Sequence, residues 1–102
     1  MDVFEAIRTR RSIRKYTDKK IEKEKLDKIL EAGRLSLSAN NQQPYCFIVV
    51  NDANKIEQIS STCNQDWQAP MMIIACAFPK EAWIRDDDEE IWKVDIAIAL
   101  NN

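Results

Sequence analysis

Histidine is absent from this sequence of 102 residues, and its absence removes several kinds of chemistry. Neither a serine–histidine nor a cysteine–histidine pair can activate a nucleophile, which excludes most hydrolase mechanisms. A zinc site of the usual type also lacks ligands, because Cys46, Cys63 and Cys76 show no CxxC spacing. We expect these thiols to be reduced and partly buried. Any catalysis by the chain is therefore expected to depend on a bound cofactor.

The sequence also lacks an apolar run of about 18 residues and the apolar segment of a signal peptide. We therefore expect a soluble cytoplasmic protein without a membrane partner. The length fits one domain with a modest core.

Charge is nearly balanced in total but not along the chain. The 15 basic and 17 acidic residues divide into 11 and 7 through Arg34, and 4 and 10 from Leu35 onward. The basic first third is the expected home of an anionic ligand. Nucleic acid is not expected as a partner, because its binding needs many phosphate contacts and the chain is acidic overall.

The segment RRSIRKY at residues 10–16 concentrates donors suited to an anion. Arg10, Arg11 and Arg14 each carry a planar fork of N–H groups that matches phosphate oxygens, and the hydroxyl of Ser12 can add another donor. In an extended segment Arg10 and Ser12 share one side, so we expect them to touch a ligand more directly than Arg11. The alternative is a solvated arginine cluster that makes only weak surface pairs.

Hydrophobic periodicity predicts an alternation of helices and strands, which is α/β or α+β in class. The expected strands are residues 45–50 and 71–78. One helix is expected before the first strand from Asp2 to about Arg10, followed by a second with a buried side at Leu26, Ile29, Leu30 and Gly33. A third helix, from Asp52 to about Cys63, lies between the strands, and a fourth, marked by Ile91, Val94 and Ile98, follows them. Both strands are continuous apolar runs of the kind buried on two faces. Gly33, the only glycine, predicts close packing, since glycine inside a helix costs about 1 kcal/mol relative to alanine. Two strands rarely form a stable sheet, so we expect the front part of a larger domain.

Two polar segments each allow two interpretations. The uncharged stretch SLSANNQQP at residues 36–44 is either a turn that satisfies its own backbone or a surface that recognises carbonyls and ring nitrogens of a ligand. The acidic run at residues 86–90 is either a divalent-metal site or negative charge placed ahead of a helix N-terminus. We favour the helix interpretation, because the glycine and alternate spacing of a calcium loop are missing.

Several of these pieces, in this order, resemble the nitroreductase family of FMN-dependent oxidoreductases. They are AIRTRRSIRKY at residues 6–16, SLSANNQQPYCFIVV at residues 36–50, a strand entered through Ala69 and Pro70, and DIAIALNN at residues 95–102. The resemblance runs the length of the chain but corresponds to about the first half of a family member. It implies an α+β fold, a nitroreductase-like sheet flanked by helices, with residues 1–102 as the N-terminal part of an FMN-binding domain.

The resemblance also implies which residues contact the cofactor. Arg10, Arg11 and Ser12 would hold the phosphate and ribityl chain of FMN, with Arg14 close by. A homodimer is implied, in which one subunit's loop lies against flavin bound mainly by the other; the matching residues are Ser36, Leu37, Ser38, Ala39, Asn41 and, less directly, Gln43. Asn64 or Gln65 matches an amide that reaches the pyrimidine edge of the flavin. Leu37 stands where proline is common, which should alter loop stiffness more than chemistry.

The implied activity is transfer of hydride from NAD(P)H through FMN to a nitroaromatic, quinone or similar acceptor. No catalytic nucleophile and no metal are implied, because the cofactor carries the chemistry. The alternatives are a non-catalytic flavin-binding module or an inactive fragment of such an enzyme, and a non-enzymatic helical adaptor.

Overall fold

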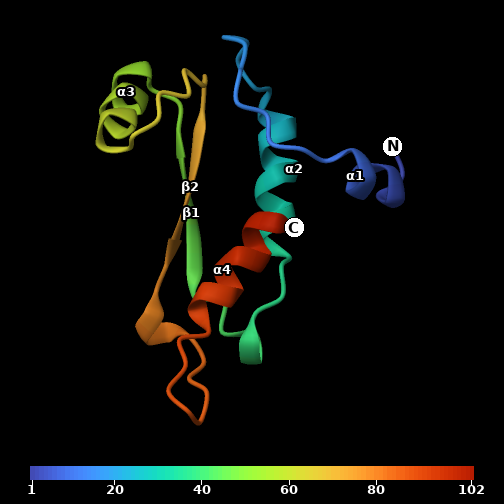
Figure 1. The fold of residues 1–102 in the computed structure, drawn as a ribbon, viewed down its shortest axis with the longest axis vertical. Coiled ribbons are helices and arrows are strands. Elements are labelled where there is room, and N and C mark those ends of the chain that lie inside the picture. The colour runs from blue at the N-terminus through green and yellow to red at the C-terminus, as the bar shows by residue number, and fades with distance from the viewer.

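The computed structural model describes residues 1–102 and is an α+β arrangement of four helices and a two-stranded sheet (Figure 1). In chain order the elements are α1 (Val3–Thr9), α2 (Lys23–Arg34), the 3-10 turn η1 (Ala39–Asn41), β1 (Tyr45–Val50), α3 (Ala53–Thr62), β2 (Met72–Ala77), the 3-10 turn η2 (Pro79–Glu81) and α4 (Trp92–Asn101). All six helices and strands expected from the sequence are present in the expected order, and the α+β class is confirmed.

Two of the helices begin where an aspartate caps them. The Asp2 carboxylate accepts a hydrogen bond from the backbone N–H of Glu5 at 2.8 Å, and Asp52 accepts one from Lys55 at 2.9 Å. Each bond satisfies an N–H that has no partner within its own helix. The sequence-based starts of α1 and α3 are therefore confirmed.

The sheet is a single antiparallel pair, with Tyr45 opposite Ala77 and Cys46 opposite Cys76. Helices α2 and α4 lie to one side of it (Figure 1). Phe47 faces α2, whereas Ile48 points to the other face and is 48% exposed. The prediction of strands buried on both faces is therefore wrong for this chain, because helices cover one face only.

Helix α2 is packed mainly at its C-terminal end. A Cβ atom added to Gly33 would lie 2.9 Å from two ring carbons of Phe47, so the predicted close packing is confirmed. Nearby, the side-chain amide of Asn102 donates to the carbonyl of Ala32 at 2.6 Å. Farther from this contact Ile29 is 53% exposed, so its predicted burial is wrong.

Helix α1 stands apart from the rest of the structure (Figure 1). Its apolar stripe is open to solvent: Val3 is 72%, Phe4 84% and Ile7 70% exposed. The buried apolar core is small and contains Ile56 and Ala99. No helix has the combination of length and apolar character that crossing a membrane requires.

Candidate functional site

The arginine segment, residues 10–16, leaves the end of α1 as exposed coil. Arg10 is the first residue beyond the helix and has extended backbone angles, φ −57° and ψ 131°. Arg10, Arg11 and Arg14 are all exposed, and none forms an ion pair with a carboxylate of the chain. Their donors, together with the exposed Ser12, are therefore free to bind an anion.

Two arginines elsewhere in the chain, Arg34 and Arg85, are paired with carboxylates. Arg34 forms two hydrogen bonds to the carboxylate of Glu31, and these bonds lower the pKa of Glu31 below its usual value. Arg85 is paired in the same two-pronged way with Asp87, whose pKa is also lowered. Such pairing neutralises each guanidinium locally. The arginines of residues 10–16, like the neighbouring Arg8 on α1, therefore differ from Arg34 and Arg85 in having no carboxylate partner.

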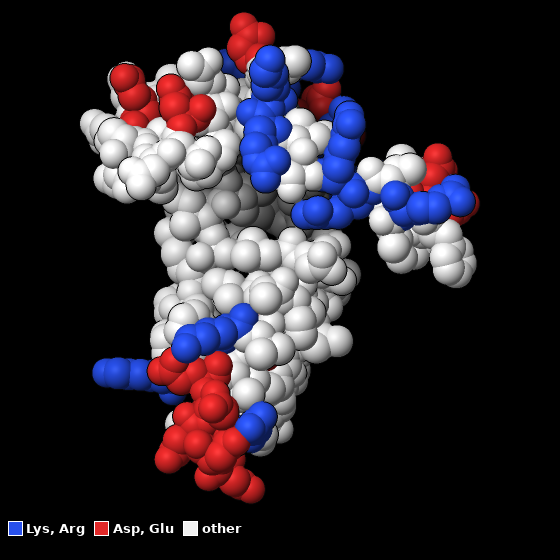
Figure 2. All heavy atoms as spheres, viewed as in Figure 1, with Lys and Arg blue, Asp and Glu red and all other residues white.

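Charge is also segregated on the surface (Figure 2). Basic side chains gather over the N-terminal coil and α2, whereas acidic ones crowd the opposite end. The acidic run at residues 86–90 lies directly ahead of α4; Asp87 pairs with Arg85, and Glu90 with Lys93 at 2.9 Å. No group of three or more carboxylates or thiols in the chain is arranged to hold a metal ion. The basic region remains the surface suited to an anion.

The second candidate segment, residues 36–44, is called the amide loop below. Both of its ends are buried, at Ser36 and Pro44. The hydroxyl of Tyr45 donates to the carbonyl of Ser36 at 3.3 Å, and the N–H of Phe78 donates to the carbonyl of Pro44 at 2.7 Å. The loop is therefore fastened to the sheet on both sides.

The middle of the amide loop is held by side chains. The Asp95 carboxylate of α4 accepts a hydrogen bond from the Ala39 N–H at 2.9 Å, and the Ser38 hydroxyl accepts one from the Gln43 N–H, also at 2.9 Å. Asp95 is only 1% exposed. These two bonds fold the loop around the 3-10 turn η1.

The loop also holds its exposed amide residues in a strained backbone conformation. Asn40, Asn41 and Gln43 have φ values of 52°, 51° and 51°, in the left-handed region that residues with a side chain seldom adopt. All three are exposed. Asparagine adopts this region more readily than other residues with a side chain, so the strain, of order 1–3 kcal/mol, is greatest at Gln43. The loop thus presents polar side chains in a fixed arrangement.

Within one chain, the sequence-predicted cofactor residues fall into separate groups. The arginine segment lies beside α1, whereas η1 lies at the other end of α2 (Figure 1). In the amide loop Ser36 is buried, Ser38 and Ala39 are half-buried, and Leu37 is 67% exposed. Asn64 and Gln65 are exposed in the connection between α3 and β2, away from both groups. No single surface of one copy therefore joins all of them.

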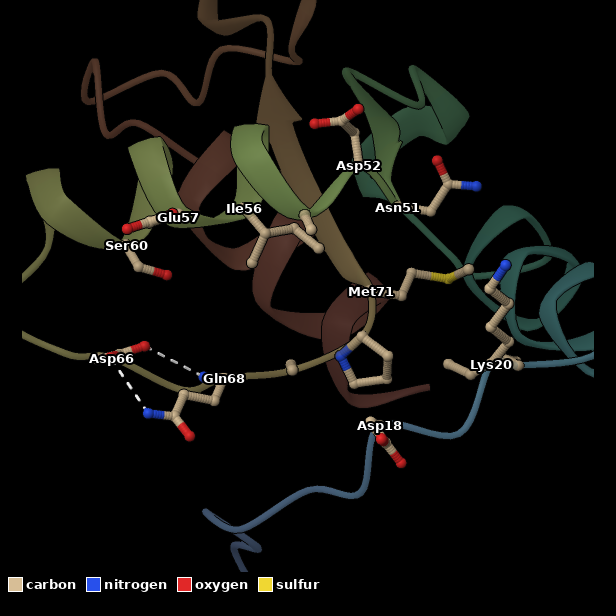
Figure 3. Close-up of a pocket in the computed structure, with 14 residues that line it drawn as sticks. Asp18, Lys20, Asn51, Asp52, Ile56, Glu57, Ser60, Asp66, Gln68 and Met71 are labelled. Carbon is tan, nitrogen blue, oxygen red and sulfur yellow. Dashed lines mark hydrogen bonds between the residues drawn. The ribbon is translucent and has the colours of Figure 1, made fainter.

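The main hollows of the structure do not coincide with the predicted cofactor residues, although Lys15 and Tyr16 of the arginine segment line one of them. A cavity of about 750 Å³ opens between α3, the coil before β2 and the N-terminal coil (Figure 3). Its carboxylates do not converge: Asp18 and Asp52 point away from the hollow, and Asp66 bonds Gln68. Neither this cavity nor those of about 520 and 310 Å³ is lined by a predicted cofactor residue.

Sequence reasoning missed two residues that shape the amide loop, Asp95 and Tyr45. A carboxylate inside the otherwise apolar DIAIALNN stretch was a usable signal, since charged residues are seldom buried without a partner. For Tyr45 no signal existed, because a tyrosine that begins a strand is ordinary.

The chain is similar in sequence to known proteins. The sequence model of the nitroreductase family matches residues 7–71. A relative in Methanothermobacter thermautotrophicus, named NADH dehydrogenase/NAD(P)H nitroreductase, is 44% identical over 105 residues, which cover 100% of this chain and 53% of the relative. The chain spans about half the length of the curated relatives it matches.

Solved structures agree with this similarity. A nitroreductase family protein from Clostridium difficile 630 superposes with a TM-score of 0.89 at 32% identity, covering 97% of this chain and 58% of that one. An FMN-dependent nitroreductase from Clostridium difficile R20291 gives a TM-score of 0.76 at 37% identity, with coverage of 91% and 53%.

Proposed function

Because this chain belongs to the nitroreductase family, we propose that its protein is an FMN-dependent oxidoreductase that takes hydride from NAD(P)H. The electrons pass to a nitroaromatic, quinone or similar small acceptor. We propose that the protein is cytoplasmic and binds neither nucleic acid nor a membrane. The names of two relatives, an NAD(P)H nitroreductase and an FMN-dependent nitroreductase, support the cofactor and the electron donor.

One observation carries the proposal: the arginines of residues 10–16 are free, while Arg34 and Arg85 are paired with carboxylates. Arg10, Arg11 and Ser12 offer the donors that the phosphate and ribityl hydroxyls of FMN require, with Arg14 close in sequence. The exposed amides of Asn41 and Gln43 suit the carbonyls and ring nitrogens of a flavin. The residues present therefore fit FMN.

We propose that two copies of the protein complete the cofactor site. The arginine segment and the amide loop are apart within one copy, so a partner's loop is needed to cover a ligand held by the arginines. The exposed apolar stripe of α1, with Phe4 84% exposed, supplies a surface that a second copy can bury. Both features support a homodimer with the cofactor at its interface.

In this proposal the chain binds and orients, and no side chain acts as a nucleophile. FMN, when bound, supplies the acceptance and release of hydride. Arg10, Arg11 and Ser12 fix the phosphate end by charge and hydrogen bonds. The amide loop, with Leu37 exposed at 67%, covers apolar ring surface and excludes water from it. Asn64 or Gln65 is assigned to the pyrimidine edge, where a donor favours negative charge on the reduced ring.

The experiment is to purify the full-length protein and follow NAD(P)H absorbance with a nitroaromatic and a quinone, with and without added FMN. FMN-dependent oxidation of NAD(P)H by either acceptor supports the proposal. Bound FMN without turnover would point to a flavin-binding module, and absence of FMN binding would overturn the proposal. Asp87→Asn, in the acidic run at the far end of the molecule, is a suitable control.

A further inference from the structure

We infer that Asp95, on α4, is a positioning residue that holds the amide loop in the conformation needed to cover the cofactor. The identity of the ligand, FMN, rests on the proposed function, whereas the contact between Asp95 and the loop is observed in the structure. No residue of the arginine segment takes part in the contact between Asp95 and the loop.

The contact joins parts of the chain that are distant in sequence. Asp95 Oδ1 accepts the hydrogen bond of the Ala39 N–H at 2.9 Å across 56 residues. The other side-chain bonds to the loop backbone come from Ser38 and Ser36, within the loop, and from Tyr45, directly after it. Asp95 is therefore the tie that links the loop to α4.

The bond is placed at the first residue of η1, which begins at Ala39. The first N–H groups of a helical turn have no partner inside the turn and carry partial positive charge. The N-cap residue Ser38 does not cap the turn with its own side chain, because its hydroxyl accepts from Gln43 instead. Asp95 thus supplies, from another element, the cap that the loop does not provide for itself.

Burial of Asp95 is unfavourable for general stability. The side chain is 1% exposed, and its second carboxylate oxygen has no hydrogen-bond partner. A buried polar atom without a partner is destabilising, whereas an apolar side chain of similar size fills such a position without that cost. The bond to Ala39 is the one compensation that the structure provides.

The consequence for the ligand lies in the next residues. Asn40 and Asn41 follow Ala39 directly and have φ values of 52° and 51°. Asparagine tolerates this conformation, but two such residues in succession form a turn whose shape depends on the contacts that flank it. Loss of the Asp95 tie frees Ala39 and allows the following residues to relax, so the side chains of Asn41 and Gln43 lose their fixed presentation.

The test compares three variants of the full-length protein. Asp95→Leu removes the acceptor and replaces the carboxylate with an apolar side chain, whereas Asp95→Asn keeps both the size and an acceptor at Oδ1. Asp52→Leu is the control, because Asp52, the N-cap residue of α3, accepts a backbone N–H at the same 2.9 Å distance and lies outside the predicted cofactor residues. FMN affinity is measured from quenching of flavin fluorescence on titration, and backbone amide exchange is measured by NMR.

For Asp95→Leu we expect the Kd for FMN to rise by about tenfold or more, whereas Asp95→Asn stays within about threefold, since the bond is kept. Exchange of the Ala39 amide in Asp95→Leu should accelerate by at least about tenfold, while amides of β1 are unchanged. Asp52→Leu should alter neither the Kd nor the Ala39 exchange. Equal FMN affinity and equal Ala39 exchange in wild type and Asp95→Leu would overturn the inference.

Two measurements keep the test decisive if Asp95→Leu does not fold. In the unaltered protein the Ala39 amide should exchange at least about 100-fold more slowly than an unstructured amide, and fast exchange would overturn the inference. Weak FMN binding by Asp95→Asn would overturn it as well. If the wild-type protein binds no FMN, the proposed function fails, and the Ala39 exchange alone decides whether Asp95 holds the loop.

Discussion

A Cβ atom on Gly33 would lie 2.9 Å from Cε2 and Cζ of Phe47, closer than carbon atoms pack. This contact is where α2 meets the sheet, and it explains why the chain's single glycine lies near the end of a helix.

Gly33→Ala should therefore destabilise the protein. Alanine gains about 1 kcal/mol of helix propensity, but overpacking against the ring costs about 1–3 kcal/mol, so we expect a net loss of about 1 kcal/mol. Chemical denaturation measures the change. In the Phe47→Leu background, where the ring is gone, Gly33→Ala should be neutral or stabilising. An equal loss in both backgrounds would show that Phe47 is not the obstacle.

Gln43→Gly should make the protein more stable and its cofactor binding weaker. Release of a left-handed residue gains roughly 1–2 kcal/mol, and the added freedom of the unfolded chain offsets about half, which leaves about 0.5–1 kcal/mol. Loss of the side-chain amide should weaken FMN binding severalfold to about tenfold. The matched control is Gln68→Gly, at φ 46° outside the loop, which should stabilise without changing FMN affinity. Equal FMN affinity in both variants would remove Gln43 from the site.

The cysteines should differ in reactivity. Burial raises the pKa of the Cys46 thiol, and Cys76, directly opposite it on β2, raises that pKa further. Cys63 is exposed. Because the thiolate is the reactive form, iodoacetamide at neutral pH should modify Cys63 at least about tenfold faster than Cys46.

Peptide mass spectrometry over a time course checks this order. The pH dependence follows from the sign of the shift: a raised pKa keeps Cys46 protonated at neutral pH, so its modification should accelerate as the pH rises toward the raised value. Cys63→Ser should remove the fast phase. Modification of Cys46 at the rate of Cys63 would contradict the burial seen in β1.

The exposed stripe of α1 should affect association. Phe4→Glu puts a charge where we propose that a second copy packs, so the dimer should dissociate more readily, by about tenfold or more in Kd. Sedimentation equilibrium measures it. Ile84→Glu changes a residue that is 65% exposed in the loop ahead of α4 and should leave association unchanged. A wild-type monomer, or a Phe4→Glu dimer of unchanged Kd, would exclude this use of α1.

Much of the fold was predictable because its signals are local. Asp2 and Asp52 indicate where helices start, and the apolar run beginning at Tyr45 indicates β1, because capping and β propensity act over a few residues. The burial of Ile29 was predicted wrongly because it depends on tertiary packing rather than on local sequence. Periodicity identifies a helix face, but only the packing partner decides how far along the helix that face is covered.

The candidate site was predictable only in part, because some of its features have local sequence signals and others depend on contacts between distant parts of the chain. The arginines and the amide loop carry local composition signals and a family resemblance, so they could be named from the sequence. The tie from Asp95 to Ala39 spans 56 residues and has no local signature beyond a charge in an apolar stretch. Likewise, that the arginines lack carboxylate partners is a property of the fold, not of their spacing.

The most direct test of the central claim, that FMN is held by the arginine segment, is titration of the full-length protein with FMN, followed by flavin fluorescence. The account predicts saturable binding, weakened by at least about tenfold in Arg10→Ala combined with Ser12→Ala, because charge-assisted bonds to phosphate are lost. Arg85→Ala, which alters an arginine already paired with Asp87, should bind as the wild type does. Equal affinity of the Arg10/Ser12 double variant and the wild type would contradict it.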